Sequence, residues 1–175
     1  MRRLELICLI LLTLGAGWFG WHRYGPRSPA RPLAPEATRI DHILIEKSAR
    51  RLTASLDGAV VMQAGISLGF APDGAKQIEG DGKTPVGLYE INRRNPNSAF
   101  HLSLGIDYPQ PDDIKRARLK GEDPGGDIFI HGQPNGVVGV TLPGDWTLGC
   151  IALSNAEMAQ LWSLTETGTA VEIRP

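Results

Sequence analysis

One cysteine of this chain lies in a setting that could support nucleophilic chemistry. Cys150 follows a glycine in the stretch GDWTLGCIAL, at the edge of a short apolar segment, whereas the other cysteine, Cys8, lies in an apolar run near the start of the chain. A lone cysteine is most often a small buried hydrophobic residue. It becomes a nucleophile when a neighbouring imidazole accepts its proton and the surroundings favour the thiolate. The fold must therefore bring a histidine to Cys150.

The chain contains four histidines, of which two are candidates for this role. His22 lies at the boundary of the N-terminal apolar run, and His42 lies at the start of a predicted strand, where a surface position is expected. His131 ends a predicted strand and precedes Cys150 by 19 residues, a span that fits a strand, a loop and a second strand with the two strand ends side by side. A structural histidine at a strand end is equally compatible with this spacing, and His101 is the alternative partner.

The residues just before Cys150 predict a site for a developing negative charge. Thr147 and Leu148 enter a turn, and Gly149 allows successive backbone N–H groups to converge near the sulfur. Convergent donors of this kind can hold the oxyanion that forms when a thiolate attacks a carbonyl. Trp146 could form a wall of the substrate cleft, although a tryptophan packed in the core is an equally good interpretation.

Composition and turn residues predict one mainly β domain. The chain has 175 residues, a formal net charge of −1, many glycines and prolines, and few aromatic residues, which is typical of short strands joined by turns. Basic and acidic residues are balanced and dispersed, so no nucleic-acid partner is predicted. From about residue 39, Ser48-Ala49 and Asp57-Gly58 separate three apolar segments and predict two hairpins, the second between strands at Arg51–Leu56 and 59–64. Further strands are expected at 86–91, 100–104, 127–131 and 170–173. One or two short helices are expected, near 112–121 and at Asn155–Leu164, the second capped by Ser154 and Glu157.

The first 24 residues are predicted to anchor the chain in a membrane. Arg2 and Arg3 precede an apolar run without charges, and Trp18 and Trp21 suit a membrane interface. A cleaved signal peptide would begin in the same way but should end in small residues, so an uncleaved transmembrane helix is the preferred interpretation. The distribution of basic residues then predicts a single-pass protein of the inner, cytoplasmic membrane with its globular domain in the periplasm or otherwise outside the cytoplasm.

A linker separates this segment from the predicted globular domain. Residues 25–38 are rich in proline, which predicts a stiff, extended spacer. The domain is expected to occupy residues 39–175. Because a membrane would separate Cys8 from Cys150, no disulfide between them is expected.

Two segments closely resemble the L,D-transpeptidase catalytic domain of the YkuD family. They are FIHGQPNG and DWTLGCIALSNAEM, and they carry the family signature His-Gly, a gap, and then Ser/Thr-x-Gly-Cys. The upstream GDGKTPVGLYEI and FHLSLGIDYP are also similar to family segments, so the resemblance covers about residues 40–175. It implies an L,D-transpeptidase-like β-sandwich or barrel, a cysteine nucleophile, no metal or other cofactor, and substrates in the bacterial cell wall.

The resemblance also implies a reaction in two steps. Cys150 attacks the carbonyl of meso-diaminopimelate in a peptidoglycan tetrapeptide stem, His131 protonates the departing D-alanine, and an amine or water then releases the thioester. The carbonyl of Gly132 orients the imidazole, and the backbone N–H groups around Leu148, Gly149 and Cys150 stabilise the oxyanion. Thr147 and Trp146 are the other predicted oxyanion or substrate-binding positions.

Two positions depart from the pattern of much of the family. Ala152 stands where arginine or asparagine is common, and Leu148 stands where histidine is common. The form DWT-x-GCIA resembles the YafK/ErfK branch, in which cross-linking and the opposite hydrolysis of peptidoglycan-linked bonds both occur. Transpeptidation, with a second stem or a lipoprotein as acceptor, and hydrolysis by an L,D-carboxypeptidase, an endopeptidase or a peptidoglycan–protein amidase therefore stay open.

Two further classes of function compete with an acyltransferase. One is a zinc site built from His101, His131, Cys150 and an aspartate, but no close ligand spacing supports it. The other is an inactive, membrane-tethered module that binds the cell wall, and the intact pair of His131 and Cys150 argues against it.

Overall fold

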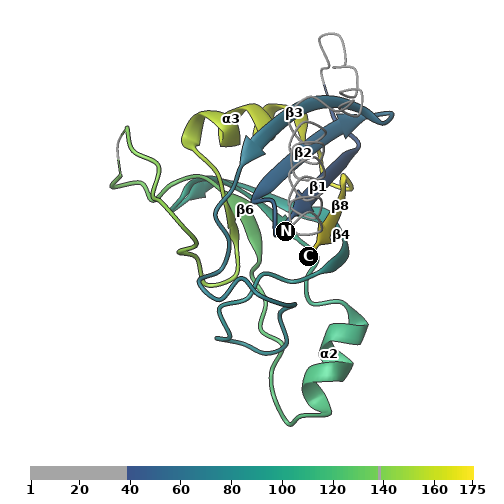
Figure 1. The fold of residues 1–175 in the computed structure, drawn as a ribbon. Coiled ribbons are helices and arrows are strands. Elements are labelled where there is room, and N and C mark those ends of the chain that lie inside the picture. The colour runs from purple at the N-terminus through teal and green to yellow at the C-terminus, as the bar shows by residue number, and fades with distance from the viewer. Residues whose placement is uncertain (1–38, 138) are drawn as a thin grey trace, which may run out of the picture. The chain divides into compact units, whose positions relative to one another are not determined.

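The computed structural model describes residues 39–137 and 139–175, and there it shows a mainly β domain with two short helices, as predicted. The predicted membrane anchor and the linker lie outside the described residues. Among the residues that are described, no helix has the length and apolar character needed to span a membrane. The elements, drawn in Figure 1, are β1 (His42–Glu46), β2 (Arg51–Leu56), β3 (Ala59–Gly65), β4 (Gly87–Ser98), β5 (His101–Ile106), α2 (Pro111–Arg118), β6 (Phe129–His131), β7 (Ile151–Ala152), α3 (Asn155–Leu164) and β8 (Ala170–Arg174).

The strands form one sheet in the order β3-β2-β1-β8-β4-β5-β6-β7. The β1–β8 and β6–β7 pairs are parallel, and the other pairs are antiparallel. Ser67, just beyond β3, exchanges backbone hydrogen bonds of 2.9 and 2.8 Å with Ala152 of β7. These bonds join the two ends of the strand order, so the sheet closes on itself as in a barrel.

Local turn chemistry explains the first hairpins. Asp57 and Gly58, between β2 and β3, have φ angles of 50° and 78°, which matches a two-residue turn that needs positive φ at both positions. The side chains of β1 alternate between buried and half-buried positions, so one face of the strand packs in the core. The predicted hairpins of β1 with β2 and of β2 with β3 are confirmed.

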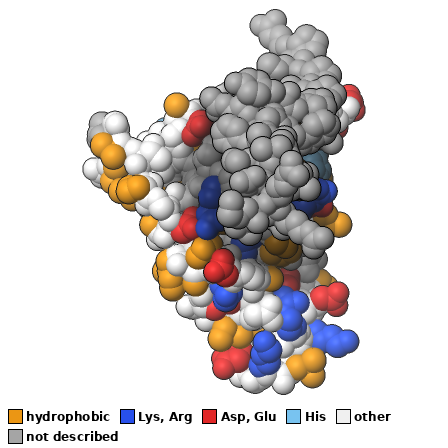
Figure 2. All heavy atoms as spheres, viewed as in Figure 1, with side chains coloured by type: hydrophobic (Ala, Val, Ile, Leu, Met, Phe, Trp, Pro, Cys, Tyr) orange, Lys and Arg blue, Asp and Glu red, His pale blue; other side chains and the backbone are white. Residues whose placement is uncertain are grey.

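The helix boundaries follow their caps. Ser154 accepts the backbone N–H of Glu157, whose side chain accepts the N–H of Ser154, and this capping box starts α3 where the sequence predicts it. The other helix, α2, begins at Pro111 and projects from the end of the sheet opposite α3 (Figure 1). On the face drawn in Figure 2, acidic and basic side chains are interspersed around α2, without a patch of one sign.

Two strands differ in length from the prediction. β4 continues from residue 91 to Ser98, and its added part is almost entirely exposed and polar, so no hydrophobic alternation marked it in the sequence. β6 starts at Phe129 rather than at residue 127, because Asp127 has a φ of 56°, outside the β region. Both differences lie beside the site described next.

Candidate active site

Adjacent parallel strands bring His131 and Cys150 to one cavity. His131 ends β6 and pairs with Ala152 of β7, whereas Cys150 directly precedes β7 and is therefore level with Phe129. The expected side-by-side strands are found, but the parallel register offsets the two side chains by two positions. Both line the same cavity, whose volume is about 660 Å³.

His131 is held in one orientation. Its Nδ1 lies 2.7 Å from the carbonyl oxygen of Gly132, so Nδ1 carries the hydrogen that this oxygen accepts and Nε2 keeps its lone pair. The residue is only 4% exposed, and this burial lowers the pKa of His131, while the bond to Gly132 opposes the shift. The neutral imidazole is therefore the favoured form, which suits a general base.

Gly132 is required by close packing at this point. A side chain there would place its Cβ 2.6 Å from Oδ1 of Asn155 and 3.0 Å from Cβ of His101. The same Oδ1 accepts the N–H of Gln133 at 2.7 Å, so it cannot move away without losing that bond. The glycine of the His-Gly pair thus lets the start of α3 approach the strand that carries the histidine.

The Cys150 thiol is half-buried and makes two weak contacts. Its Sγ accepts the N–H of Phe129 at 3.4 Å and lies 3.5 Å from the carbonyl oxygen of Asp127. Burial raises the pKa of Cys150, and the bond from Phe129 opposes this shift. With the pKa of His131 lowered, the two groups that line the cavity rest as a neutral thiol and a neutral imidazole. Proton transfer must then accompany attack by the sulfur.

Thr147 closes the turn that precedes the cysteine. Its buried hydroxyl donates to the carbonyl of Cys150 at 2.7 Å and accepts the N–H of Gly149 at 3.1 Å. In the described part of the chain, the N–H groups of Leu148 and Cys150 donate to no acceptor. Of the three donors expected for an oxyanion, these two are therefore free, and that of Gly149 already serves the turn.

Gly149 is also the only residue type that fits its position. Its φ of 134° lies in the region that favours glycine, and an added Cβ would stand 2.8 Å from the carbonyl oxygen of Lys83. The loop that contains Lys83 therefore packs directly against the turn.

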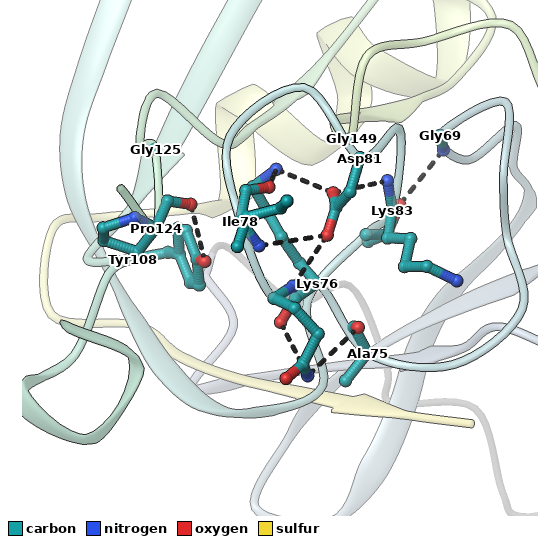
Figure 3. A network of polar contacts seen from close by, with 12 residues as sticks. Gly69, Ala75, Lys76, Ile78, Asp81, Lys83, Tyr108, Pro124, Gly125 and Gly149 are labelled. Carbon is teal, nitrogen blue, oxygen red and sulfur yellow. Dashed lines mark hydrogen bonds and ion pairs between the residues drawn. The ribbon is translucent and has the colours of Figure 1, made fainter. Parts of the chain in front are cut away.

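A carboxylate that is 11% exposed organises this supporting loop (Figure 3). Asp81 accepts the N–H groups of Gln77, Ile78 and Lys83 at 2.7, 3.2 and 3.1 Å, and its carboxylate binds Nζ of Lys76 at 3.0 Å. Burial raises the pKa of Asp81, but the donated hydrogen bonds outweigh it and the net shift is downward, so the ion pair persists at neutral pH. The signal for this loop in the sequence is GDGKTP, in which a carboxylate stands between two glycines.

Trp146 lines the cavity. Its ring meets the His131 ring edge to face at a centroid distance of 5.8 Å. Its Nε1 is buried and has no hydrogen-bond partner in the described residues. The preceding Asp145 binds Arg50 at 2.7 Å and accepts the N–H of Leu68 at 2.9 Å, so the turn is fastened to the first half of the sheet.

The alternative histidine occupies a different environment. His101 starts β5 with a φ of 65°, and the cavity is lined by His131 and not by His101 within the part of the chain that the structure describes. Residues 39–137 and 139–175 contain no group of three or more His, Cys, Asp or Glu side chains placed to hold a metal ion.

The sequence matches the family model of YkuD, the L,D-transpeptidase catalytic domain, over residues 40–173. The chain belongs to this family. No significant match is found among curated protein sequences.

Solved structures with the same YkuD-type fold include proteins of three bacteria. Pgp2, a helical cell shape determining protein of Campylobacter jejuni, is 29% and 28% identical in two crystal structures, with TM-scores of 0.60 and 0.59, covering 82% and 80% of this chain and 49% and 52% of that chain. Bd1075 of Bdellovibrio bacteriovorus is 24% identical, with a TM-score of 0.56, and the match covers 82% of this chain and 51% of that chain. An L,D-transpeptidase of Xylanimonas cellulosilytica is 19% identical, with a TM-score of 0.52 and coverages of 89% and 68%.

The YkuD chain thus spans about half the length of Pgp2 and of Bd1075. The paired His-Gly and Thr-x-Gly-Cys motifs fall inside the matched residues, and their His131, Thr147 and Cys150 line one cavity. The family assignment and the geometry therefore rest on the same residues.

Proposed function

We propose that this YkuD-family protein is an L,D-transpeptidase, a cysteine acyltransferase that acts on peptidoglycan stem peptides. The observation that carries the proposal is the placement of His131 and Cys150 in one cavity, with the imidazole fixed through Nδ1 to the carbonyl of Gly132. In this orientation Nε2 is the nitrogen available to a thiol proton.

The proposed acylation step uses these two side chains. The stem tetrapeptide binds in the cavity, Nε2 of His131 takes the thiol proton, and Sγ of Cys150 bonds to the carbonyl carbon of meso-diaminopimelate. The carbonyl oxygen becomes an oxyanion that the free N–H groups of Leu148 and Cys150 stabilise. When the C–N bond breaks, the imidazolium returns the proton to the amine of D-alanine, which leaves, and a thioester remains.

Release of the thioester reverses these proton movements. An amine, or water, gives a proton to Nε2 of His131 and attacks the thioester carbon. The second tetrahedral oxyanion collapses, the C–S bond breaks, and the departing sulfur of Cys150 recovers the proton. An amine acceptor gives a cross-link or an attached protein, whereas water gives a shortened stem.

The wider setting of the reaction is part of the proposal. We infer that residues 1–24 anchor the protein in the inner membrane and that the domain faces peptidoglycan outside the cytoplasm, with a second stem or a lipoprotein as acceptor. The similarity to Pgp2, which is named for helical cell shape, supports a role in shaping the wall.

Purified peptidoglycan fragments with tetrapeptide stems test the proposal. The full-length protein is incubated with them, with and without a lipoprotein acceptor, and the products are identified by mass spectrometry beside a Cys150→Ala control. Release of D-alanine with formation of cross-linked or lipoprotein-linked stems supports transpeptidation, and tripeptide stems alone support hydrolysis. Products that do not differ between the native protein and Cys150→Ala would refute the proposed function.

A further inference from the structure

The tip of the β4–β5 hairpin lies against the imidazole of His131. The ring of Phe100, at this tip, has its centroid 4.6 Å from that of His131, with the planes 42° apart. Trp146 contacts the same imidazole from another direction, at 5.8 Å and 67°. Two aromatic rings therefore cover the proposed base.

The stability of the turn alone does not explain an aromatic residue at position 100. It lies in the two-residue turn between the paired residues Ser98 and His101, and the side chain stays 37% exposed. Such turns favour glycine, asparagine and aspartate. The ring is only partly removed from water, and among the ring pairs of the described residues it lies nearer to the His131 imidazole, at 4.6 Å, than to Trp146, at 6.2 Å.

Asn135 fastens the hairpin tip from the loop that follows His131. Its Oδ1 accepts the N–H of His101 at 2.8 Å, its Nδ2 donates to the carbonyl of Ser98 at 3.0 Å, and its backbone N–H donates to the carbonyl of Ala99 at 3.0 Å. Both polar groups of the Asn135 side chain, the carbonyl and the amide, are thus hydrogen-bonded to the hairpin tip.

A further bond joins the tip to the glycine that orients the imidazole. The N–H of Gly132 donates to the carbonyl oxygen of Phe100 at 3.0 Å and to that of Leu102 at 3.2 Å. The carbonyl of Gly132 accepts from Nδ1 of His131, so the tip, the glycine and the imidazole form one hydrogen-bonded unit.

We propose that Asn135 and Phe100 are positioning residues for His131: Asn135 fixes the hairpin tip, and the ring of Phe100 keeps the imidazole on the carbonyl of Gly132 and away from water. This inference deepens the proposed function, and the effect that it predicts on catalysis rests on that function. Burial is the main cause of the lowered pKa of His131, and Phe100 supplies part of that burial.

The shielding has a defined effect on pH dependence. Without the ring, water solvates the imidazolium, the pKa of His131 rises toward its ordinary value, and the acid limb of the pH–rate profile moves to higher pH. The ionisable groups on the segments packed around His131 or across its cavity are Cys150, His101, Asp127, Glu157, Lys76, Glu79, Asp145, Arg93 and Arg94. All of them are retained in the variants below, so a shift reports the loss of the shield.

The test measures the imidazole directly. NMR titration of His131 is recorded for the native protein, Phe100→Leu, Phe100→Tyr, Asn135→Ala and the matched control Asn97→Ala, whose side chain lies in the same hairpin and makes no hydrogen bond in the described structure. We expect an upward shift of about one pH unit in Phe100→Leu and Asn135→Ala, which leaves about tenfold less neutral imidazole, and about tenfold lower kcat/KM, on the acid side. Phe100→Tyr and Asn97→Ala should titrate like the native protein.

The outcomes separate this inference from the proposed function. A native titration in both Phe100→Leu and Asn135→Ala would overturn the positioning role even if peptidoglycan is turned over. A shifted titration would support the role even if no turnover were detected. Phe100 is partly exposed, so the comparison of Phe100→Leu with Phe100→Tyr stays informative if Asn135→Ala fails to fold.

Discussion

The hydroxyl of Thr147 provides the sharpest prediction about the turn that presents the nucleophile. Thr147→Val keeps the volume and the branched shape of the side chain but removes the oxygen that joins Gly149 to Cys150. Because Thr147 is 4% exposed, water cannot replace that oxygen. The N–H of Gly149 and the carbonyl of Cys150, now bonded at 3.1 and 2.7 Å, would lose these partners.

The size of the effect follows from these two lost bonds. A buried polar group without a partner costs about 1–3 kcal/mol, so with two such groups the variant should lose about 2–6 kcal/mol of unfolding free energy. For a chain of this size the loss corresponds to a decrease in Tm of about 4–24 °C. Displacement of the free N–H groups of the turn should lower kcat/KM about a hundredfold, as the loss of one oxyanion donor does.

The assay compares Thr147→Val with Thr147→Ser, which retains the hydroxyl. Urea unfolding and thermal denaturation measure stability, and release of D-alanine from tetrapeptide stems measures activity. Thr147→Ser should lie close to the native protein in both. If Thr147→Val matches Thr147→Ser in stability and rate, the hydroxyl does not organise the turn and the explanation for this motif position is wrong.

Three other predictions concern the base, pH and the membrane. His131→Ala should lower the rate of acylation by about a hundredfold to ten-thousandfold, as expected for loss of a general base, and His101→Ala should not; the opposite result would assign the base to His101. Burial raises the pKa of Cys150 above 9.0, so unfolding free energy should decrease above pH 9.0, and urea titrations of Cys150→Ser should lack this alkaline loss. Burial lowers the pKa of His131 below 6.5, so unfolding free energy should also decrease below pH 6.5. Membrane fractions should retain the full-length chain, with residues beyond 35 digested by protease added outside the inner membrane; a mature form that begins near residue 26 would instead show a cleaved signal.

Local features of the sequence predicted the parts of the fold that depend on neighbouring residues. Asp57-Gly58 marked a hairpin and Ser154 with Glu157 marked a helix start, because turns and caps are set by residues close in the chain. The length of β4 could not be predicted in this way, since its exposed polar half is paired with β5 through backbone bonds that no side-chain pattern reveals.

The same distinction applies to the site. The paired motifs predicted that His131 and Cys150 lie together. Both hydrogen bonds of the Thr147 side chain lie within the Thr-x-Gly-Cys motif, because their partners are two and three residues away. The contacts of Asn135 with the hairpin tip join residues more than thirty positions apart, and nothing in either segment alone indicates them. The offset of Cys150 from His131 depends on the parallel register of β6 and β7, which also requires the assembled sheet.

The central claim is that Cys150 forms a covalent acyl-enzyme, and intact-protein mass spectrometry with a carbapenem tests it most directly. A thiolate opens the strained β-lactam carbonyl without releasing a leaving group, so the acyl-enzyme can accumulate. The native protein should gain the mass of one carbapenem, peptide mapping should place it on Cys150, and the rate should increase with pH as more thiolate forms. Cys150→Ser should gain no such mass under the same conditions. A stable adduct on another residue, or modification of Cys150→Ser at the native rate, would contradict the assignment of Cys150 as the nucleophile.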